Sequence, residues 1–199
     1  MTLGDALHLV FIVDAATAAR PDHLDAALGS GVSAVWLREP KATGAELFKT
    51  ARDLAVRCGT HGTALIVGDR ADVAMAVGAQ GVQLGHRSPP LSRVRPWFDG
   101  WVGVSCHSAG DLRRAGEDGA DYAVLSPVFG VPEKGTPLGT ERFTSFLDEA
   151  GDLPVVALGG IETSNVESVR ATAATGVAVI RALRDATDPV GAARTLSGR

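Results

Sequence analysis

The sequence has 199 residues and a formal net charge of −4; 45% of its residues are hydrophobic and 21% are charged. This composition is typical of a soluble globular protein, and the scattered basic residues exclude the basic face of a nucleic-acid-binding protein. The N-terminus lacks the basic region of a signal peptide, and no apolar run approaches the ~20 residues of a membrane span. We expect a cytoplasmic protein without nucleic-acid or membrane partners, whose two cysteines are free thiols.

Short apolar segments recur along the whole chain and indicate the fold class. They lie at residues 8–14, 34–39, 64–69, 81–85, 101–107, 122–128, 154–160 and 176–183. Their Val, Ile and Leu residues do not alternate with polar ones, which is typical of parallel strands buried on both faces. Between the strands, capping boxes at Thr43–Glu46 and Ser164–Glu167 predict helix starts, and Gly59 and Gly151 stand where helices are expected to end.

Alternating strands and helices predict an α/β protein, and the number of strands favours a closed (β/α)8 TIM barrel. We expect one compact domain over residues 1–199, because no linker or low-complexity stretch divides the chain. A doubly wound open sheet remains an alternative if one or two predicted strands are wrong. Its dinucleotide-binding form lacks support, because no Gly-x-Gly-x-x-Gly motif opens a helix.

In such a barrel, functional side chains gather at the C-terminal ends of the strands. Gly159 and Gly160 in "ALGGIETSN" end the seventh predicted strand and precede a helix. Glycines let backbone N–H groups approach an anion closely, so we expect a phosphate there, with Ile180 and Arg181 at the end of the eighth predicted strand. The alternative is that the two glycines only make a tight turn.

Three further charged residues at strand ends are candidates for ligand binding. Lys134, in the loop "FGVPEKGTPLG", suits a phosphate or carboxylate, or is a solvated surface lysine. Arg38 suits bidentate binding of an anion, or pairs with the neighbouring Glu39. Asp69 suits a metal or a substrate donor, or pairs with Arg70. Ser126 ends the sixth predicted strand.

His107 in "GVSCHSAGDL" stands between a strand and a helix that Ser108 is expected to cap. The helix N-terminus disfavours the imidazolium, and a neutral histidine can accept a proton and return it. Alternation places Ser105 on the same face and Cys106 on the opposite one, where we expect a buried thiol. The alternative is a packed, hydrogen-bonded histidine without chemistry. His86 also lies at the mouth, within reach of a substrate.

Taken together, these segments resemble the thiamine phosphate synthase/TenI family. The stretches that carry the resemblance are "IVDA", "VWLREP", "IVGDRADVAMAVGAQGVQLG", "VGVSCHSAGDLRRAGEDGADYAVLSPVF", "VVALGGI" and "GVAVI", which cover nearly the whole chain in order. The resemblance implies a (β/α)8 barrel with a phosphorylated thiazole in its site. It also implies one of two activities, because the family has two branches.

Synthases of this family join a pyrimidine diphosphate to a thiazole phosphate with magnesium. This chain departs from their pattern where Trp36 replaces Gln, Pro40 replaces Lys, Gly68 replaces Asn and Ser88 replaces a metal-binding Asp. Asp69 alone would remain of the magnesium pair, and one carboxylate is a poor site for a metal that must hold a diphosphate. Lys134 does match a lysine of the diphosphate loop.

The TenI branch resembles this chain more closely at "SCHS". Relatives there are thiazole tautomerases, which move a proton in a thiazole phosphate carboxylate without a metal or other cofactor. We therefore expect a tautomerase in which His107 carries the proton and Arg38 either holds the carboxylate or helps to polarise the ring. A magnesium-dependent synthase and a non-catalytic thiazole-phosphate-binding regulator remain alternatives. Barrels with short helices often pair, so the expectation includes a homodimer.

Overall fold

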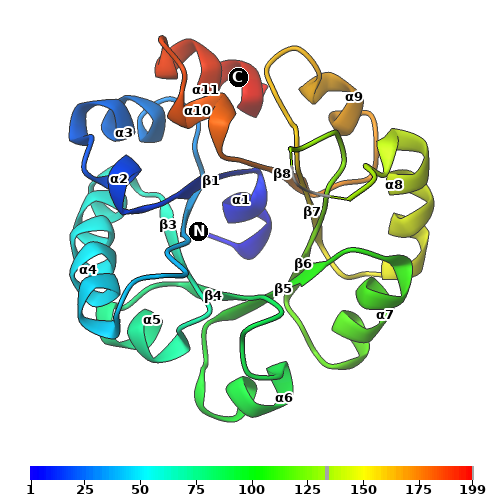
Figure 1. Ribbon diagram of the computed structural model, residues 1–199, viewed down its shortest axis with the longest axis horizontal. Coiled ribbons are helices and arrows are strands. Elements are labelled where there is room, and N and C mark those ends of the chain that lie inside the picture. The colour runs from blue at the N-terminus through cyan, green and yellow to red at the C-terminus, as the bar shows by residue number, and fades with distance from the viewer. Residues whose placement is uncertain (133–134, 199) are drawn as a thin grey trace.

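The computed structural model describes residues 1–132 and 135–198. Its strands are β1 (Leu9–Val13), β2 (Ala34–Leu37), β3 (Ala64–Gly68), β4 (Gly81–Leu84), β5 (Trp101–Cys106), β6 (Tyr122–Leu125), β7 (Val155–Leu158) and β8 (Gly176–Val179). Every strand runs parallel to its neighbours in chain order, and β1 also pairs with β8, which closes the barrel (Figure 1). The predicted (β/α)8 barrel is confirmed.

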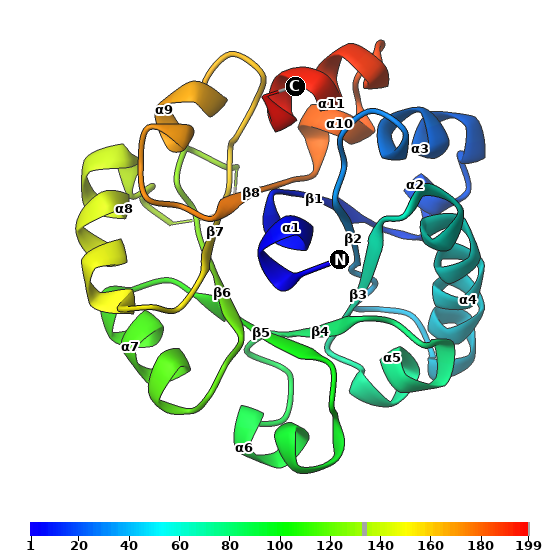
Figure 2. The same ribbon diagram turned by 180° about the vertical axis from the view of Figure 1, so that it is seen from behind.

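The helices form a ring outside the strands, with one exception (Figures 1 and 2). They are α1 (Leu3–Leu7), α2 (Ala15–Ala18), α3 (Pro21–Leu28), α4 (Gly44–His61), α5 (Ala71–Val77), α6 (Leu91–Val94), α7 (Ala109–Glu117), α8 (Gly139–Leu147), α9 (Val166–Arg170), α10 (Arg181–Arg184) and α11 (Pro189–Ser197), with 3₁₀ turns η1 (Arg95–Trp97) and η2 (Asp148–Ala150). The exception is α1, which lies inside the ring of strands in both views. None of the described helices is long and apolar enough to cross a membrane.

Two layers of core explain why the strand sequences do not alternate. One layer lies between the strands and the outer helices, and the other fills the barrel interior. Residues such as Phe11 and Leu37 face the helices, whereas Ile12, Trp36 and Tyr122 face inward. Both faces of a strand are therefore buried, as expected for a parallel barrel.

Helix α1 closes the barrel at the end where the strands begin. Thr2 and Asp5 form a capping box at its start, and Ala6 and Leu7 pack against the inward-facing strand residues. The sequence analysis does not predict this helix, because five residues are too few for a helical period. The capping box at Thr2 is the signal that could have found it.

Several predicted boundaries are corrected by the structure. The capping box at Thr43–Glu46 is confirmed, but α9 begins after Asn165, so Ser164 is not its cap. Helix α4 continues through Gly59 and ends at His61, followed by the C-cap Gly62 with a φ of 65°. A glycine inside a helix costs only about 1 kcal/mol, whereas the left-handed C-cap favours glycine strongly. Gly151 does follow a helical turn, η2.

The end of the eighth strand is also corrected. The strand ends at Val179, and Arg181 is the first residue of α10 rather than the last of a strand. Ile180, with φ −116° and ψ −79°, turns the chain out of the extended conformation. The predicted strand is too long because the apolar run continues through Leu183, and a short buried helix and a buried strand share that pattern.

Candidate active site

Two cavities lie at the C-terminal ends of the strands. The central cavity has a volume of about 490 Å³ and is lined by Trp36, Arg38, Gly68, Asp69, Gln83, Gly85, His86, Arg87, Ser105, His107, Ser126, Pro127, Gly135, Thr136, Leu138 and Leu158. The glycine cavity has about 250 Å³, and its lining includes Gly159, Gly160, Ile180, Arg181 and Arg184. Ser126, Pro127 and Leu158 line both, so the two cavities adjoin.

The two cavities bring together every predicted site residue that the structure describes. Arg38, Asp69, Ser105 and His107 line the central cavity, and Ser126 stands on the shared wall. Gly159, Gly160, Ile180 and Arg181 line the glycine cavity. Lys134 lies outside the described residues.

The glycine cavity depends on two left-handed glycines. Gly159 and Gly160 have φ values of 108° and 64°. A Cβ at Gly159 would lie 2.8 Å from the Cα of Pro127, and one at Gly160 would lie 2.8 Å from the Cβ of Phe129. The glycines therefore make a tight turn under the loop that follows β6. Among the described residues, the N–H groups of Gly160 and Ile161 donate to no protein acceptor, which leaves them available to an anion.

His107 is held in one orientation at the rim of the central cavity. Its Nδ1 lies 2.8 Å from the carbonyl oxygen of Ser126. Because a carbonyl can only accept, Nδ1 carries the proton and Nε2 is left as an acceptor. The ring is exposed, and Ser108 caps α7 as predicted. Such a histidine can take up a proton at Nε2.

The residues around His107 are fixed by burial and hydrogen bonds. The backbone N–H of His107 donates to Oδ2 of Asp111 at 3.0 Å. Burial alone would raise the pKa of Asp111, but this hydrogen bond and the nearby Arg114 outweigh it, so the pKa lies below its usual range. Burial raises the pKa of Cys106 to about 12, which keeps it a thiol, as expected of a core residue.

Asp69 is engaged by a hydroxyl group rather than by a second carboxylate. Ser88 Oγ donates to Asp69 Oδ1 at 2.5 Å and accepts from the N–H of Gly85 at 2.8 Å. Arg70 pairs with Asp72, so the alternative of an Asp69–Arg70 pair is not observed. Within residues 1–132 and 135–198, no group of three His, Cys, Asp or Glu side chains could hold a metal ion. Magnesium in a diphosphate site takes one or two carboxylates together with the substrate's phosphates, and the single carboxylate here is already engaged by Ser88, so it fits such an ion poorly.

Two arginines share the central cavity with Asp69. Arg38 and Arg87 line this cavity, as does His86. Glu39 accepts from the backbone N–H of Ala15 at 2.8 Å, so it does not form the alternative ion pair with Arg38. Over the part of the chain that the structure describes, Arg38 and Arg87 make no ion pair or side-chain hydrogen bond. Arg87 is a site residue that the sequence analysis missed, because an arginine in a short loop carries no distinctive signal.

The floor of the central cavity contains two further residues that sequence reasoning did not select. Trp36 and Gln83 are 6% and 1% exposed, and Trp36 Nε1 and Gln83 Oε1 have no partner in the described structure. Gln83 Nε2 donates to Ser105 Oγ at 3.2 Å. A Cβ at Gly68 would lie 3.1 Å from Trp36 Nε1, so Gly68 makes room for the indole. A polar residue inside a buried strand is the signal that could have identified Gln83.

Comparisons with known proteins agree with this arrangement. A family model described as thiamine monophosphate synthase matches residues 9–183. The bifunctional protein ThiM/ThiE of Symbiobacterium thermophilum is 39% identical over 98% of the chain, but the chain spans only 41% of that relative. A thiamine-phosphate synthase of Archaeoglobus fulgidus is 36% identical over 98% of the chain and 93% of its own length.

A solved structure shows the same fold. The thiamine phosphate pyrophosphorylase of Pyrococcus furiosus superposes with a TM-score of 0.90 at 30% identity, covering 99% of this chain and 96% of that one. The Archaeoglobus fulgidus relative is named a thiamine-phosphate synthase, and none of these three proteins is named a tautomerase. The chain belongs to the thiamine monophosphate synthase family.

Proposed function

We propose that this protein is an enzyme of thiamine biosynthesis that joins a pyrimidine diphosphate to a thiazole phosphate. The observation that carries the proposal is the pair of adjoining cavities at one end of the barrel. A reaction between two substrates needs two binding places with a common boundary, whereas a single small substrate needs only one. The names of the relatives support the same reaction. The synthase, an alternative at the sequence level, thus has more support than the tautomerase.

Each cavity suits one of the two substrates. The N–H groups of Gly160 and Ile161 would hold the thiazole phosphate in the glycine cavity. Arg38 and Arg87 would hold the diphosphate in the central cavity through paired N–H donors. The shared wall at Ser126 and Leu158 would bring the two rings together. As the bond between the rings forms, the bond to the diphosphate breaks, and the guanidinium groups stabilise the departing charge.

The test is to incubate the purified protein with both substrates and to quantify thiamine phosphate and diphosphate by chromatography. One series contains magnesium and the other contains EDTA. We expect both products in equal amounts. Absence of thiamine phosphate in both series would overturn the proposal. Gly160→Ala serves as a site variant, because its added Cβ would contact Phe129, and it should raise the KM for the thiazole phosphate.

A specific observation favours the tautomerase as a second candidate. His107 lines the central cavity with its Nδ1 engaged by the carbonyl of Ser126, and Asp69 accepts a hydrogen bond from Ser88. This arrangement suits proton transfer in a thiazole phosphate carboxylate without a metal. Proton exchange into that substrate in EDTA, in a protein that forms no thiamine phosphate, would favour the tautomerase. Binding of thiazole phosphate with neither activity would favour the non-catalytic regulator.

A further inference from the structure

We infer that Arg87 and Arg38 neutralise the diphosphate directly, so that diphosphate binding to this protein does not depend on a divalent metal. The inference rests on the proposed function and concerns the central cavity. It starts from the poor fit between the residues present and a magnesium ion. Asp69 faces a hydroxyl group, and that hydroxyl already donates to it at 2.5 Å.

The segment from Gly85 to Ser88 is built as a tight turn. The N–H of Ser88 donates to the carbonyl oxygen of Gly85 at 3.0 Å, which is the hydrogen bond of a β-turn. His86 and Arg87 occupy the two central positions of this turn. Ser88 Oγ then ties the turn to Asp69 at the end of β3. The hydroxyl that stands where a second carboxylate would be needed therefore also fixes the place of Arg87 on the rim.

The charges on the central cavity point to an anionic ligand. Arg38 and Arg87 contribute two positive charges and Asp69 contributes one negative charge, and all three side chains line the cavity. Neither guanidinium pairs with a carboxylate within the described residues. A guanidinium presents its N–H donors as a planar fork that matches phosphate oxygens. Two such groups supply charge that a magnesium ion would otherwise bring with the diphosphate.

The test is calorimetric titration with inorganic pyrophosphate, which needs no turnover. The titrations are run on the full chain in EDTA and again in magnesium, with free pyrophosphate matched. We expect the wild-type Kd in EDTA to lie within about threefold of the value in magnesium. Arg87→Ala should weaken binding in EDTA about tenfold or more, because a charged hydrogen bond is lost. Arg113→Ala, an exposed arginine on α7 away from the cavity, is the matched control and should bind like the wild type.

A second variant makes the prediction independent of Arg87. Ser88→Asp adds a carboxylate beside Asp69, so pyrophosphate binding should weaken in EDTA and recover in magnesium. Wild-type binding that requires magnesium, binding unchanged in Arg87→Ala, or no binding in either buffer would each overturn the inference. Product formation in magnesium without pyrophosphate binding in EDTA would overturn this inference alone. Binding in EDTA without thiamine phosphate formation would overturn the proposed function and leave the inference standing.

Discussion

At the scale of single residues, the fixed tautomer of His107 makes a clear prediction for proton transfer. His107→Gln keeps a polar side chain but removes the Nε2 acceptor, so the tautomerase candidate predicts that proton exchange into a thiazole phosphate carboxylate falls at least ~100-fold. The measurement is deuterium exchange followed by NMR. His61→Gln is the control, because His61 pairs with Asp25 of α3 and lines neither of the two described cavities. Equal exchange in wild type and His107→Gln would exclude a catalytic role for this ring.

Trp36 and Gly68 form a pair in which one residue makes room for the other. A Cβ at position 68 would lie 3.1 Å from both Trp36 Nε1 and the carbonyl oxygen of Leu37. We expect Gly68→Ala to lower the free energy of unfolding by ~1–3 kcal/mol, as overpacking usually does. In a Trp36→Phe background the cost should be smaller, because phenylalanine lacks the indole N–H edge. Urea unfolding of the four proteins in a double-mutant cycle measures this coupling, and additive effects would contradict it.

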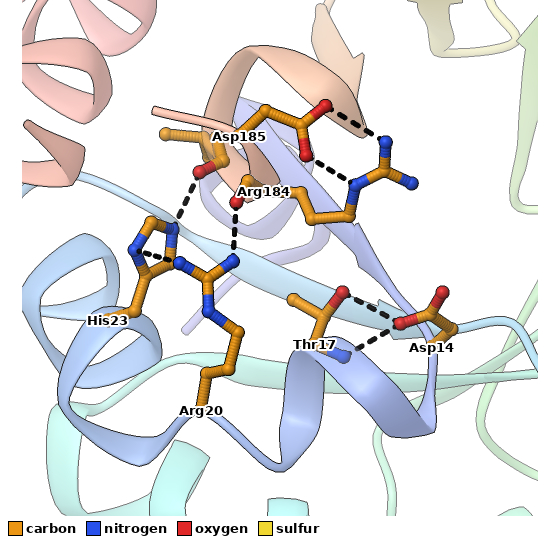
Figure 3. A network of polar contacts seen from close by, with 7 residues as sticks. Asp14, Thr17, Arg20, His23, Arg184 and Asp185 are labelled. Atoms are coloured by element: carbon orange, nitrogen blue, oxygen red, sulfur yellow. Dashed lines mark hydrogen bonds and ion pairs between the residues drawn. The ribbon is translucent and has the colours of Figure 1, made fainter. Parts of the chain in front are cut away.

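At the scale of elements, α3 holds α10 in place beside the glycine cavity. Arg20 Nη1 donates to the carbonyl oxygen of Arg184 at 2.7 Å, and His23 Nε2 lies 2.7 Å from that of Leu183 (Figure 3). Arg20 Nη2 also lies 3.1 Å from His23 Nδ1, which fixes the histidine tautomer. These contacts satisfy the last carbonyl groups of a four-residue helix, which has few hydrogen bonds of its own. Helix α10 in turn carries Arg181 into the glycine cavity.

We therefore expect Arg20→Ala to act on substrate binding more than on turnover. The KM for the phosphate substrate should rise several-fold while kcat changes less than about twofold, because a ground-state binding contact is displaced. Steady-state kinetics with the phosphate substrate varied is the measurement. Arg52→Ala is the control, because Arg52 is exposed on α4 and pairs with its neighbour Asp53. A fall in kcat at unchanged KM would show that the contact serves another step.

Asp111 makes the stability of the β5–α7 junction depend on pH. Its folded-state pKa is lowered, so its contribution to stability is complete above the ordinary carboxyl range and disappears as pH falls through the lowered value. The amide of Asp111→Asn can still accept from the N–H of His107 but does not titrate. Between pH 5 and pH 2, about the range in question, wild type should lose more unfolding free energy than Asp111→Asn. Urea unfolding at each pH is the measurement. An equal loss of unfolding free energy in the two proteins would contradict this assignment.

At the scale of the whole molecule, the barrel could be predicted and parts of the site could not. Runs of Val, Ile and Leu such as residues 64–68 indicate a strand that is buried on both faces, so the sequence predicts the eight strands. The strand-end rule by itself groups His107, Arg38 and Gly159 at one end of the barrel. The Ser88–Asp69 hydrogen bond and the close approach of Trp36 to Gly68 each join segments that are distant along the chain. Such contacts have no local pattern, so only the closed barrel reveals them.

The two ends of the barrel should also respond differently to mutation. The residues that stabilise the fold at one end are separated in space from the residues that bind substrate at the other end. Helix α1 places Leu7, which is fully buried, among the inward-facing residues at the end away from the cavities (Figure 2). Leu7→Ala should cost ~2–5 kcal/mol of unfolding free energy through lost burial and a new cavity. For a chain of this size that corresponds to a fall in Tm of roughly 5–15 °C.

The same variant should keep the wild-type Kd for pyrophosphate at temperatures well below its Tm, because no residue of α1 lines either of the two described cavities. Val56→Ala, at a side chain 70% exposed on α4, is the stability control and should shift Tm by no more than about 2 °C. Calorimetric melting and pyrophosphate titration of the three proteins separate the two properties. A Leu7→Ala protein with a normal Tm would mean that α1 is not part of the core. A Leu7→Ala protein with a normal Tm but weakened pyrophosphate binding would mean that the two ends of the barrel are coupled.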